Sequence, residues 1–421
     1  MAHYDRLETR EKKARRGNLE QALPLQIEHA KKKCPAYAKI LAHIDPEEID
    51  SRAALATLPL TRRADLPQFQ HHTPPFGVLV AVGLGDLSRV FQSPGRIYQP
   101  EASRNDYWRM ARALFAAGFR PGDLIHNACS YHLSPWGFMM ESGAHELGCA
   151  VIPAGEAALE RQVQAVHDLK PTGFVGSAKA LQALLDQAVT LGKNASSLEK
   201  ALVVGEAVAK AQQRAFADGG IDLYHCYASV ELGLIGYESE ARAGLISDEG
   251  ILVEIVRPGT AESVPDGEVG ELVVTTFNPD YPLIRFATGD LSAVLPGVSP
   301  CGRTNTRLRG FLGCAEQATT VANVTLYPAQ VAEILKRHPE LQRGRLVGNH
   351  GDQDPGITLH CQLATGQDAS INPELLAKVA STLHDITQLQ GEVAVVPPGS
   401  LANDGVVIDD PQRRAQPPKG E

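Results

Sequence analysis

Two short stretches combine carboxylates with the small and hydroxyl residues that often surround nucleotides or metals. Residues 227–231 read Tyr-Ala-Ser-Val-Glu and follow an apolar segment. They are therefore expected at a strand end, on the carboxyl edge of an open α/β sheet, where ligands usually bind. Residues 281–290 end in Gly289-Asp290, and a carboxylate behind a glycine can bind a ribose diol or a metal. Taken alone, each carboxylate fits a structural cap or an ion pair better than a catalytic role.

A third stretch, residues 91–100, is expected to be a turn-rich loop in the sequence position of a phosphate-binding loop. Such loops use glycines so that successive backbone N–H groups converge on the anion. This stretch contains one glycine, Gly95, and the prolines Pro94 and Pro100, which have no N–H to donate. We expect a poor phosphate cradle.

The composition excludes several classes of protein. The 421 residues are 43% hydrophobic and 21% charged, which is typical of globular proteins. A net charge of -9 with 5% aromatic residues argues against nucleic-acid binding. The seven cysteines show no metal-binding spacing, and no apolar stretch approaches the ~20 residues of a membrane span. We expect a reduced, cytoplasmic protein without a nucleic-acid or membrane partner.

Strands and helices alternate in the part of the chain that must position these residues. Strands are expected at 123–128, 150–153, 173–175 and 200–204, and helices at 106–117, 137–147, 159–169, 178–191 and 208–218. This alternation is typical of βαβ units and of a mainly parallel sheet covered on both faces. The segment before it, residues 1–33, is expected to be a solvated helix.

The pattern changes twice towards the C-terminus. Short β runs at 251–257, 270–276 and 291–295 predict an antiparallel β subdomain. After residue 313, helices at 328–337 and 373–386 and strands at 345–347, 357–363 and 392–396 predict a small α+β domain. The predicted fold is α/β, with a large N-terminal domain (1–315) and a small C-terminal lid domain (316–421).

Several motifs follow one another in a familiar order. They lie at 126–132, 143–153, 160–164, 227–231, 267–272, 282–290 and 301–304. In this order the chain resembles the phenylacetate-CoA ligase family of AMP-binding adenylating enzymes, the acyl-CoA synthetase superfamily, over nearly its whole length. The resemblance implies an enzyme that joins a carboxylic acid to AMP, rotates its C-terminal domain and transfers the acyl group to CoA. It implies ATP, magnesium and CoA as cofactors.

The resemblance also implies roles for individual residues. Glu231 would hold magnesium and Asp290 would bind the AMP ribose. The nucleotide-binding residues would be Gly205, Glu206, Ala207, Tyr227, Ala228, Ser229, Arg285 and Asp290. The acyl pocket would be formed by Tyr131, His132, Trp136 and Gly137, although Trp136 fits a core position equally well. We predict Glu231 and Arg303 as catalytic residues.

Some positions depart from the family pattern and make the ATP-site motifs degenerate. Cys314 stands where a hinge arginine contacts the nucleotide, and Val406 stands where a C-terminal lysine neutralises the α-phosphate. Losing such a cation commonly lowers the rate by ~10²–10³. Several family members bind a structural zinc through cysteines, of which only Cys301 remains here, so we predict no zinc.

Two hypotheses follow. The first is a carboxylate-CoA ligase (acid-thiol ligase) acting on an aryl or other small acid, with an impaired or remodelled ATP site in which Arg96, Arg285 or Arg303 supplies the missing charge. The alternative is a ligase-like protein without adenylation activity, either an acyltransferase between CoA and an acyl carrier or an acyl-binding pseudoenzyme. We favour the first, because the match covers the chain and remodelled sites can still work. The expected partners are a small carboxylic acid or an acyl-CoA, and the resemblance is compatible with a homodimer.

Overall fold

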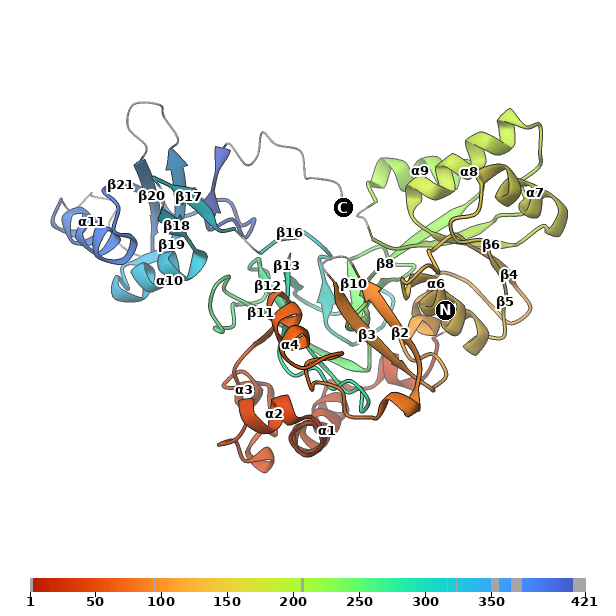
Figure 1. The fold of residues 1–421 in the computed structure, drawn as a ribbon. Helices are drawn as coiled ribbons and strands as arrows, with labels where there is room; N and C mark the ends of the chain where they lie inside the picture. The colour runs from red at the N-terminus through yellow and green to blue at the C-terminus, as the bar shows by residue number, and fades with distance from the viewer. Residues whose placement is uncertain are drawn as a thin grey trace. The chain divides into compact units, whose positions relative to one another are not determined.

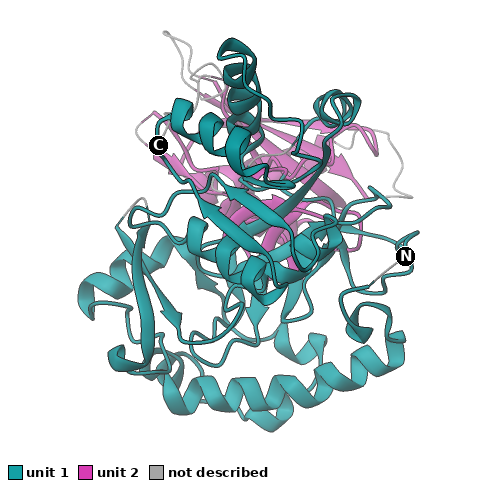
Figure 2. Cartoon of the chain, turned by 90° about the vertical axis from the view of Figure 1, so that its right-hand side faces the viewer, with its two compact units in different colours: residues 1–253, 273–287, 294–311 teal, residues 254–272, 288–293, 312–421 magenta. Residues whose placement is uncertain are grey.

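The structure is a computed structural model that describes residues 3–93, 96–205, 208–315, 317–322, 324–349, 356–364 and 373–411 (Figure 1). The chain divides into two compact units (Figure 2). Unit 1 comprises residues 1–253, 273–287 and 294–311, and unit 2 comprises residues 254–272, 288–293 and 312–421. Unit 2 thus includes residues 254–272, 288–293 and 312–315 of the predicted N-terminal domain, and the boundary at 315/316 stays a prediction.

A nine-stranded sheet organises unit 1. Across the sheet, the strands are β14 (Val294–Leu295), β15 (Arg307–Leu308), β10 (Leu245–Ser247), β9 (Gly233–Glu238), β8 (Asp222–Ser229), β7 (Lys200–Val203), β6 (Gly173–Gly176), β4 (Leu124–Asn127) and β5 (Ala150–Pro153). The strands from β5 to β8 pair in parallel, whereas those from β8 to β14 pair antiparallel. The predicted α/β class is confirmed, and the segment predicted as βαβ units forms the parallel half of the sheet, whereas the other half is antiparallel.

Helices cover both faces of this sheet. They are α5 (Met110–Ala116), α6 (Trp136–Glu146), α7 (Leu159–Leu169), α8 (Ala178–Thr190) and α9 (Lys210–Asp218). Along β7, Leu202 packs in a buried cluster with α5 and α6, whereas Ala201 and Val203 pack in a second cluster with α7, α8 and α9. Successive side chains of a strand point to opposite faces. The two clusters are therefore the two hydrophobic layers that the parallel sheet separates.

The N-terminal segment is more deeply packed than predicted. It comprises η1 (Arg6–Thr9), α1 (Lys12–Lys33), α2 (Pro35–Ile40), η2 (Pro46–Glu48), α3 (Arg52–Leu55), β1 (Thr61–Arg62), η3 (Arg63–Asp65) and α4 (Leu66–His72). Leu23, Ile27 and Ala30 of α1 are fully buried, and the Gln26 side chain donates to the carbonyls of Thr276 and Asn278. The helix is therefore solvated on one side only.

Residues 91–93 and 97–100 lie in two paired strands, so the expectation of a turn-rich loop is wrong for them. After η4 (Leu84–Asp86), strand β2 (Leu87–Ser93) pairs antiparallel with β3 (Ile97–Ala102), and Val90 lies opposite Pro100. Proline is tolerated in edge strands, and each strand of this two-stranded sheet is an edge. Pro94 and Gly95 lie outside the described residues.

A second sheet has strand order β1–β13–β12–β11. Its strands are β13 (Phe286–Ser292), β12 (Gly270–Thr276) and β11 (Ile251–Val256), and β16 (Gly313–Cys314) pairs with β13. The strands predicted at 251–257 and 270–276 are confirmed. The sequence predicted an antiparallel sheet here. Strand β1 pairs with β13 in parallel, so the sheet is not purely antiparallel.

The C-terminal part of unit 2 has its own hydrophobic core. It contains β17 (Thr319–Val321), β18 (Val324–Leu326), α10 (Pro328–Arg337), β19 (Leu341–Asn349), β20 (Gly356–Leu363), α11 (Pro373–Thr387), β21 (Gly391–Val396) and β22 (Ile408–Asp409). Four strands form a sheet in the order β21–β20–β19–β22. Val331 and Ile334 of α10 and Val379 and Leu383 of α11 are buried in this core. Within the described residues, no helix is long and apolar enough to cross a membrane.

Candidate functional site

Glu231 lies in a tight turn that joins β8 to β9. The backbone N–H of Leu232 donates to Ser229 Oγ at 3.2 Å, and Gly233 follows with a φ of 70°. A Cβ atom at Gly233 would lie 2.6 Å from the carbonyl oxygen of Trp108, so only glycine fits this position. The turn places the Glu231 side chain inside the fold, where it is 1% exposed.

Arg63 neutralises the Glu231 carboxylate. Its Nε atom lies 3.0 Å from Glu231 Oε1, and its own side chain is 46% exposed. A carboxylate removed from water needs a cation or a proton, because burial of an uncompensated charge is strongly unfavourable. Sequence reasoning missed Arg63, which is 168 residues from Glu231 in the chain and is marked only by the basic pair Arg62-Arg63.

Residues predicted to contact the nucleotide follow two neighbouring parallel strands. Val203 of β7 pairs with His225 of β8. Gly205, just beyond β7, and Tyr227 to Ser229, in the part of β8 beyond its pairing with β7, therefore lie at the same carboxyl edge of the parallel strands. Gly205 is exposed and has a φ of 94°, whereas Ala228 packs partly against the core. Glu206 and Ala207 lie outside the described residues.

The residues predicted to form the acyl pocket follow β4 at that edge, but their surroundings differ from one another. The Tyr131 hydroxyl donates to Glu141 at 2.8 Å and accepts from Asn127 at 2.7 Å. Burial and then the hydrogen bond to Glu141 raise the pKa of Tyr131. Trp136 is partly buried against the core. The His132 side chain is 77% exposed, and its Nδ1 lies 3.5 Å from Glu156, so His132 is not enclosed with Tyr131.

Gly137 leaves room for the Tyr131 ring to pack against its backbone. Replacing Gly137 by alanine is expected to destabilise the protein by about 1–3 kcal/mol. A Cβ atom there would lie 2.6 Å from the ring, whose hydroxyl is held at its far end. Thermal unfolding of Gly137→Ala measures the effect. Gly17→Ala in α1, where a Cβ would meet nothing within 4 Å, is the control and is expected to raise stability slightly. A Gly137→Ala variant as stable as the wild type would contradict the prediction.

Asp290 belongs to unit 2 and lies near the end of β13. Its backbone N–H donates to Thr288 Oγ1 at 3.1 Å, and it is paired across the strand with Cys314 of β16. Gly289 before it has a φ of 79°, which favours glycine at this position. The side chain is partly exposed, as a binding role requires.

The comparisons with known proteins agree with one another. A family model described as AMP-binding enzyme matches residues 130–278. The phenylacetate-coenzyme A ligase of Thermus thermophilus is 32% identical over 358 residues, covering 81% of this chain and 79% of that protein. The phenylacetate-coenzyme A ligase of Aromatoleum evansii is 30% identical over 394 residues, covering 89% of this chain and 88% of that protein. The chain belongs to the phenylacetate-CoA ligase family.

A solved structure supports the fold of this phenylacetate-CoA ligase family member. An open conformation of 2-hydroxyisobutyryl-CoA ligase, in complex with 2-HIB-AMP and CoA, matches with a TM-score of 0.71 at 23% identity. The match covers 94% of this chain and 91% of that chain. The predicted combination of a large α/β part and a small C-terminal part is therefore confirmed as the ligase fold.

Arg303 lies in a buried charge network. It is 1% exposed, with Nε 3.0 Å from Glu8 and Nη1 3.1 Å from Glu240. Glu8 is itself fully buried and also accepts hydrogen bonds from Arg112 and from the Tyr237 hydroxyl. These contacts favour a structural role for Arg303, which connects the N-terminal segment to the rest of unit 1.

Arg285 is likewise used within the fold. Its side chain is fully buried, and its Nη1 donates to the backbone carbonyls of Ala56 and Leu58. Its φ of 43° is a conformation that side-chain-bearing residues rarely adopt. Two of the three arginines predicted to supply charge to the ATP site, Arg285 and Arg303, therefore have other partners, and the third, Arg96, is exposed. Arg63, which was not predicted, contacts Glu231.

Cys301 is surrounded by donors. Ser239 Oγ, Ser299 Oγ and Arg303 Nη1 lie 3.3, 3.0 and 3.3 Å from its Sγ atom. Burial would raise the pKa of this thiol, but hydrogen bonds from Ser239, Ser299 and Arg303 outweigh burial and lower it. Within the described residues, no group of three or more His, Cys, Asp or Glu side chains is arranged to hold a metal. The absence of a zinc site stays a prediction.

The segment around Val406 is fixed by Gln317 and Arg345. Gln317 donates to the Gly405 carbonyl at 2.7 Å and accepts from the backbone N–H groups of Val407 and Ile408. Arg345 Nε donates to the Val406 carbonyl at 3.2 Å. Val406 itself is partly buried. The backbone at residue 406, where the family pattern predicts a lysine, is therefore held in place by these contacts.

Proposed function

We propose that this protein is an ATP-dependent ligase that activates a small carboxylic acid, aryl or other, as an acyl-adenylate and transfers the acyl group to CoA. The observation that carries the proposal is the buried Glu231 in the β8–β9 turn, neutralised by Arg63, in a chain that belongs to the phenylacetate-CoA ligase family. A carboxylate is kept buried at the carboxyl edge of an open sheet, where ligands of such folds bind.

We assign roles to the residues on this basis. Proteins usually bind magnesium through one or two carboxylates together with substrate phosphates. The one carboxylate at this site, that of Glu231, therefore fits this ion. When bound, magnesium would neutralise the charge of the phosphates. Asp290 is proposed to bind the ribose, and Tyr131 is proposed to line the acyl site with its ring. Gly205 and Tyr227 are proposed to bind the nucleotide.

Arg63 is proposed to remodel the ATP site. It contributes a guanidinium beside Glu231 and remains 46% exposed, so it can also contact a phosphate. Guanidinium groups bind phosphate oxygens through paired N–H donors. Arg63 thus takes over the compensating role that the sequence alone assigned to Arg96, Arg285 or Arg303.

A second candidate function is favoured by the segment around Val406. Its backbone is pinned by Gln317 and Arg345, and it carries no cation at residue 406. A protein that has lost adenylation could still bind acyl-CoA, and then move an acyl group between CoA and a carrier or serve as a binding protein. Acyl-CoA binding without ATP binding would identify this alternative.

The first experiment is a pyrophosphate-release assay with ATP, magnesium, CoA and a panel of aryl and short aliphatic acids. Acid-dependent release of pyrophosphate together with thioester formation is the expected result. Calorimetric titration with ATP and, separately, with an acyl-CoA is run on the same preparation. A flat assay combined with no ATP binding refutes the ligase proposal, and acyl-CoA binding in that case supports the alternative.

Replacing Val406 by lysine is expected to raise the rate of adenylate formation about tenfold, because a hydrogen bond to a charged group contributes about 1.5–3 kcal/mol. Pyrophosphate release at saturating ATP measures the change. Ala402→Lys, at an exposed position of the same segment, adds an equal charge and is expected to have no effect. Equal rates in the wild type and both variants would show that residue 406 does not face the reaction.

A further inference from the structure

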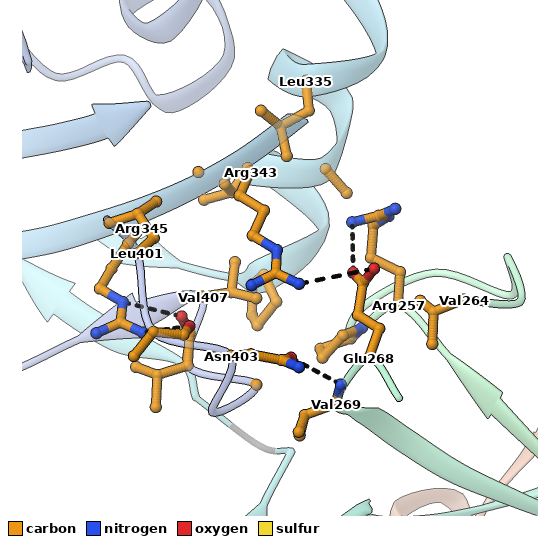
Figure 3. Close-up of a pocket in the computed structure, with 18 residues that line it drawn as sticks. Arg257, Val264, Glu268, Val269, Leu335, Arg343, Arg345, Leu401, Asn403 and Val407 are labelled. Carbon is orange, nitrogen blue, oxygen red and sulfur yellow. Dashed lines mark hydrogen bonds and ion pairs between the residues drawn. The ribbon is translucent and has the colours of Figure 1, made fainter. Parts of the chain in front are cut away.

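Unit 2 contains a cavity with charged groups that have no role in the proposed function. Its volume is about 60 Å³, and it lies among the β11–β12 connection, α10, β19 and residues 401–407 (Figure 3). Arg257, Arg343 and Glu268 contribute charged groups, and Val264, Leu335 and Leu401 contribute apolar surface. The cavity therefore combines charge with an apolar rim.

The charges of the cavity do not balance. Arg257 Nη1 and Arg343 Nη2 each lie 3.8 Å from an oxygen of the same carboxylate, Glu268 (Figure 3). Both distances exceed the 2.7–3.2 Å typical of N–H···O hydrogen bonds. The single Glu268 carboxylate thus faces two guanidinium groups without a short hydrogen bond to either. The three side chains together carry a net charge of about +1. Both arginine side chains are accessible, at 31% and 25% exposure.

The neighbouring Arg345, unlike Arg257 and Arg343, makes close contacts with its acceptors. Its Nη2 lies 2.5 Å from Asp404 Oδ1, and its Nε donates to the Val406 carbonyl. The wall beside it is fixed by Asn403, which donates to the Gly267 carbonyl and accepts from the Val269 N–H, each at 2.9 Å. The walls are thus held by their own contacts, which leaves Arg257 and Arg343 to face a ligand. A preorganised wall lowers the entropy lost on binding.

We propose that this cavity binds a phosphate group. A buried water needs roughly 10–15 Å³ of such volume, so the cavity has room for a group of about five heavy atoms, the size of a phosphate. Two guanidinium groups can each present paired donors to phosphate oxygens. The source is either inorganic phosphate or the phosphate monoester of a nucleotide. The phosphate proposal does not rest on the proposed function, because Arg257, Arg343 and Glu268 have no part in that function, although Val406 also lines the cavity.

Calorimetric titration of the full chain with inorganic phosphate at low ionic strength tests the site. Arg343→Gln and Arg257→Gln are each expected to weaken binding about tenfold, because each removes a charged donor. Glu268→Gln is expected to tighten binding several-fold, because it removes the carboxylate that competes with phosphate for the same arginines. Arg337→Gln is the control: this exposed arginine of α10 pairs with Glu333 at 2.8 Å and is expected to leave binding unchanged.

The opposite effects of the arginine and glutamate variants keep the test independent of folding, since a misfolded variant cannot bind more tightly. No phosphate binding to the wild type overturns the proposal, and so does equal or weaker binding by Glu268→Gln. Competition between phosphate and CoA, but not dephospho-CoA, would identify the phosphate monoester of CoA as the source. Competition by neither would identify free phosphate as the ligand.

Discussion

Arg303→Ala is expected to destabilise the protein by about 3 kcal/mol. The substitution removes a fully enclosed side chain and takes a cation from Glu8, which is 0% exposed. Arg112 and Tyr237 still bind Glu8, which limits the loss, whereas Glu240 is 28% exposed and regains water. Denaturant unfolding measures the change, with the midpoint shifted and the slope unchanged.

The control for this prediction is Arg16→Ala. Arg16 is 79% exposed and pairs with Glu20 within α1, and such surface pairs contribute at most ~0.5 kcal/mol. Arg303→Lys tests the geometry of the network, because an ammonium keeps the charge but loses the planar fork that reaches both Glu8 and Glu240. A stable Arg303→Ala variant with lost activity would restore the catalytic role that the sequence suggested.

The elements that sequence reasoning placed well are those with strong local patterns. The helices predicted at 159–169 and 328–337 have those bounds in the structure, as α7 and α10. Val163 and Val166 in the first helix, and Val331 and Ile334 in the second, are buried at the helical spacing that the pattern indicated. A buried face repeated every three or four residues identifies a helix without tertiary information.

Local turn chemistry shifted other boundaries. A helix was expected from residue 106, but α5 begins at Met110. Asp106 adopts a φ of 43°, and its carboxylate accepts hydrogen bonds from the N–H groups of Met110 and Ala111. An aspartate that binds backbone N–H groups in this way favours a helix start over a helix interior. The sequence shows the aspartate but not the turn that it closes.

The candidate site was predictable in part. The motif at 227–231 located Glu231 and the edge of the sheet on which it lies, because a strand followed by polar residues is a local signal. Its partner Arg63 is 168 residues away, and the partners Arg303 and Glu8 are 295 residues apart. Which arginine reaches which carboxylate depends on how distant segments pack. The sequence therefore located the buried carboxylate, but it did not show that Arg63 is its partner.

Glu231→Gln is expected to lower ATP-dependent pyrophosphate release by ~10²–10³, the usual effect of removing one charged group from a preorganised site. Its stability is expected to change little, because the amide has the same shape and the freed Arg63 is already half exposed to water. Arg63→Gln is expected to behave differently. It removes the guanidinium that neutralises a carboxylate that is 1% exposed, and a buried charge left uncompensated destabilises the fold.

The pair of variants separates binding chemistry from structure. If Glu231 serves only as the partner of Arg63, both single variants lose stability and Glu231→Gln keeps its activity. If Glu231 acts on the nucleotide, Glu231→Gln loses activity at nearly constant stability, and the double variant Arg63→Gln/Glu231→Gln recovers the stability that Arg63→Gln lost, but not the activity. Unfolding curves and pyrophosphate release for the four proteins decide the matter. The recovery is expected because removing both members of a buried ion pair leaves no uncompensated charge behind.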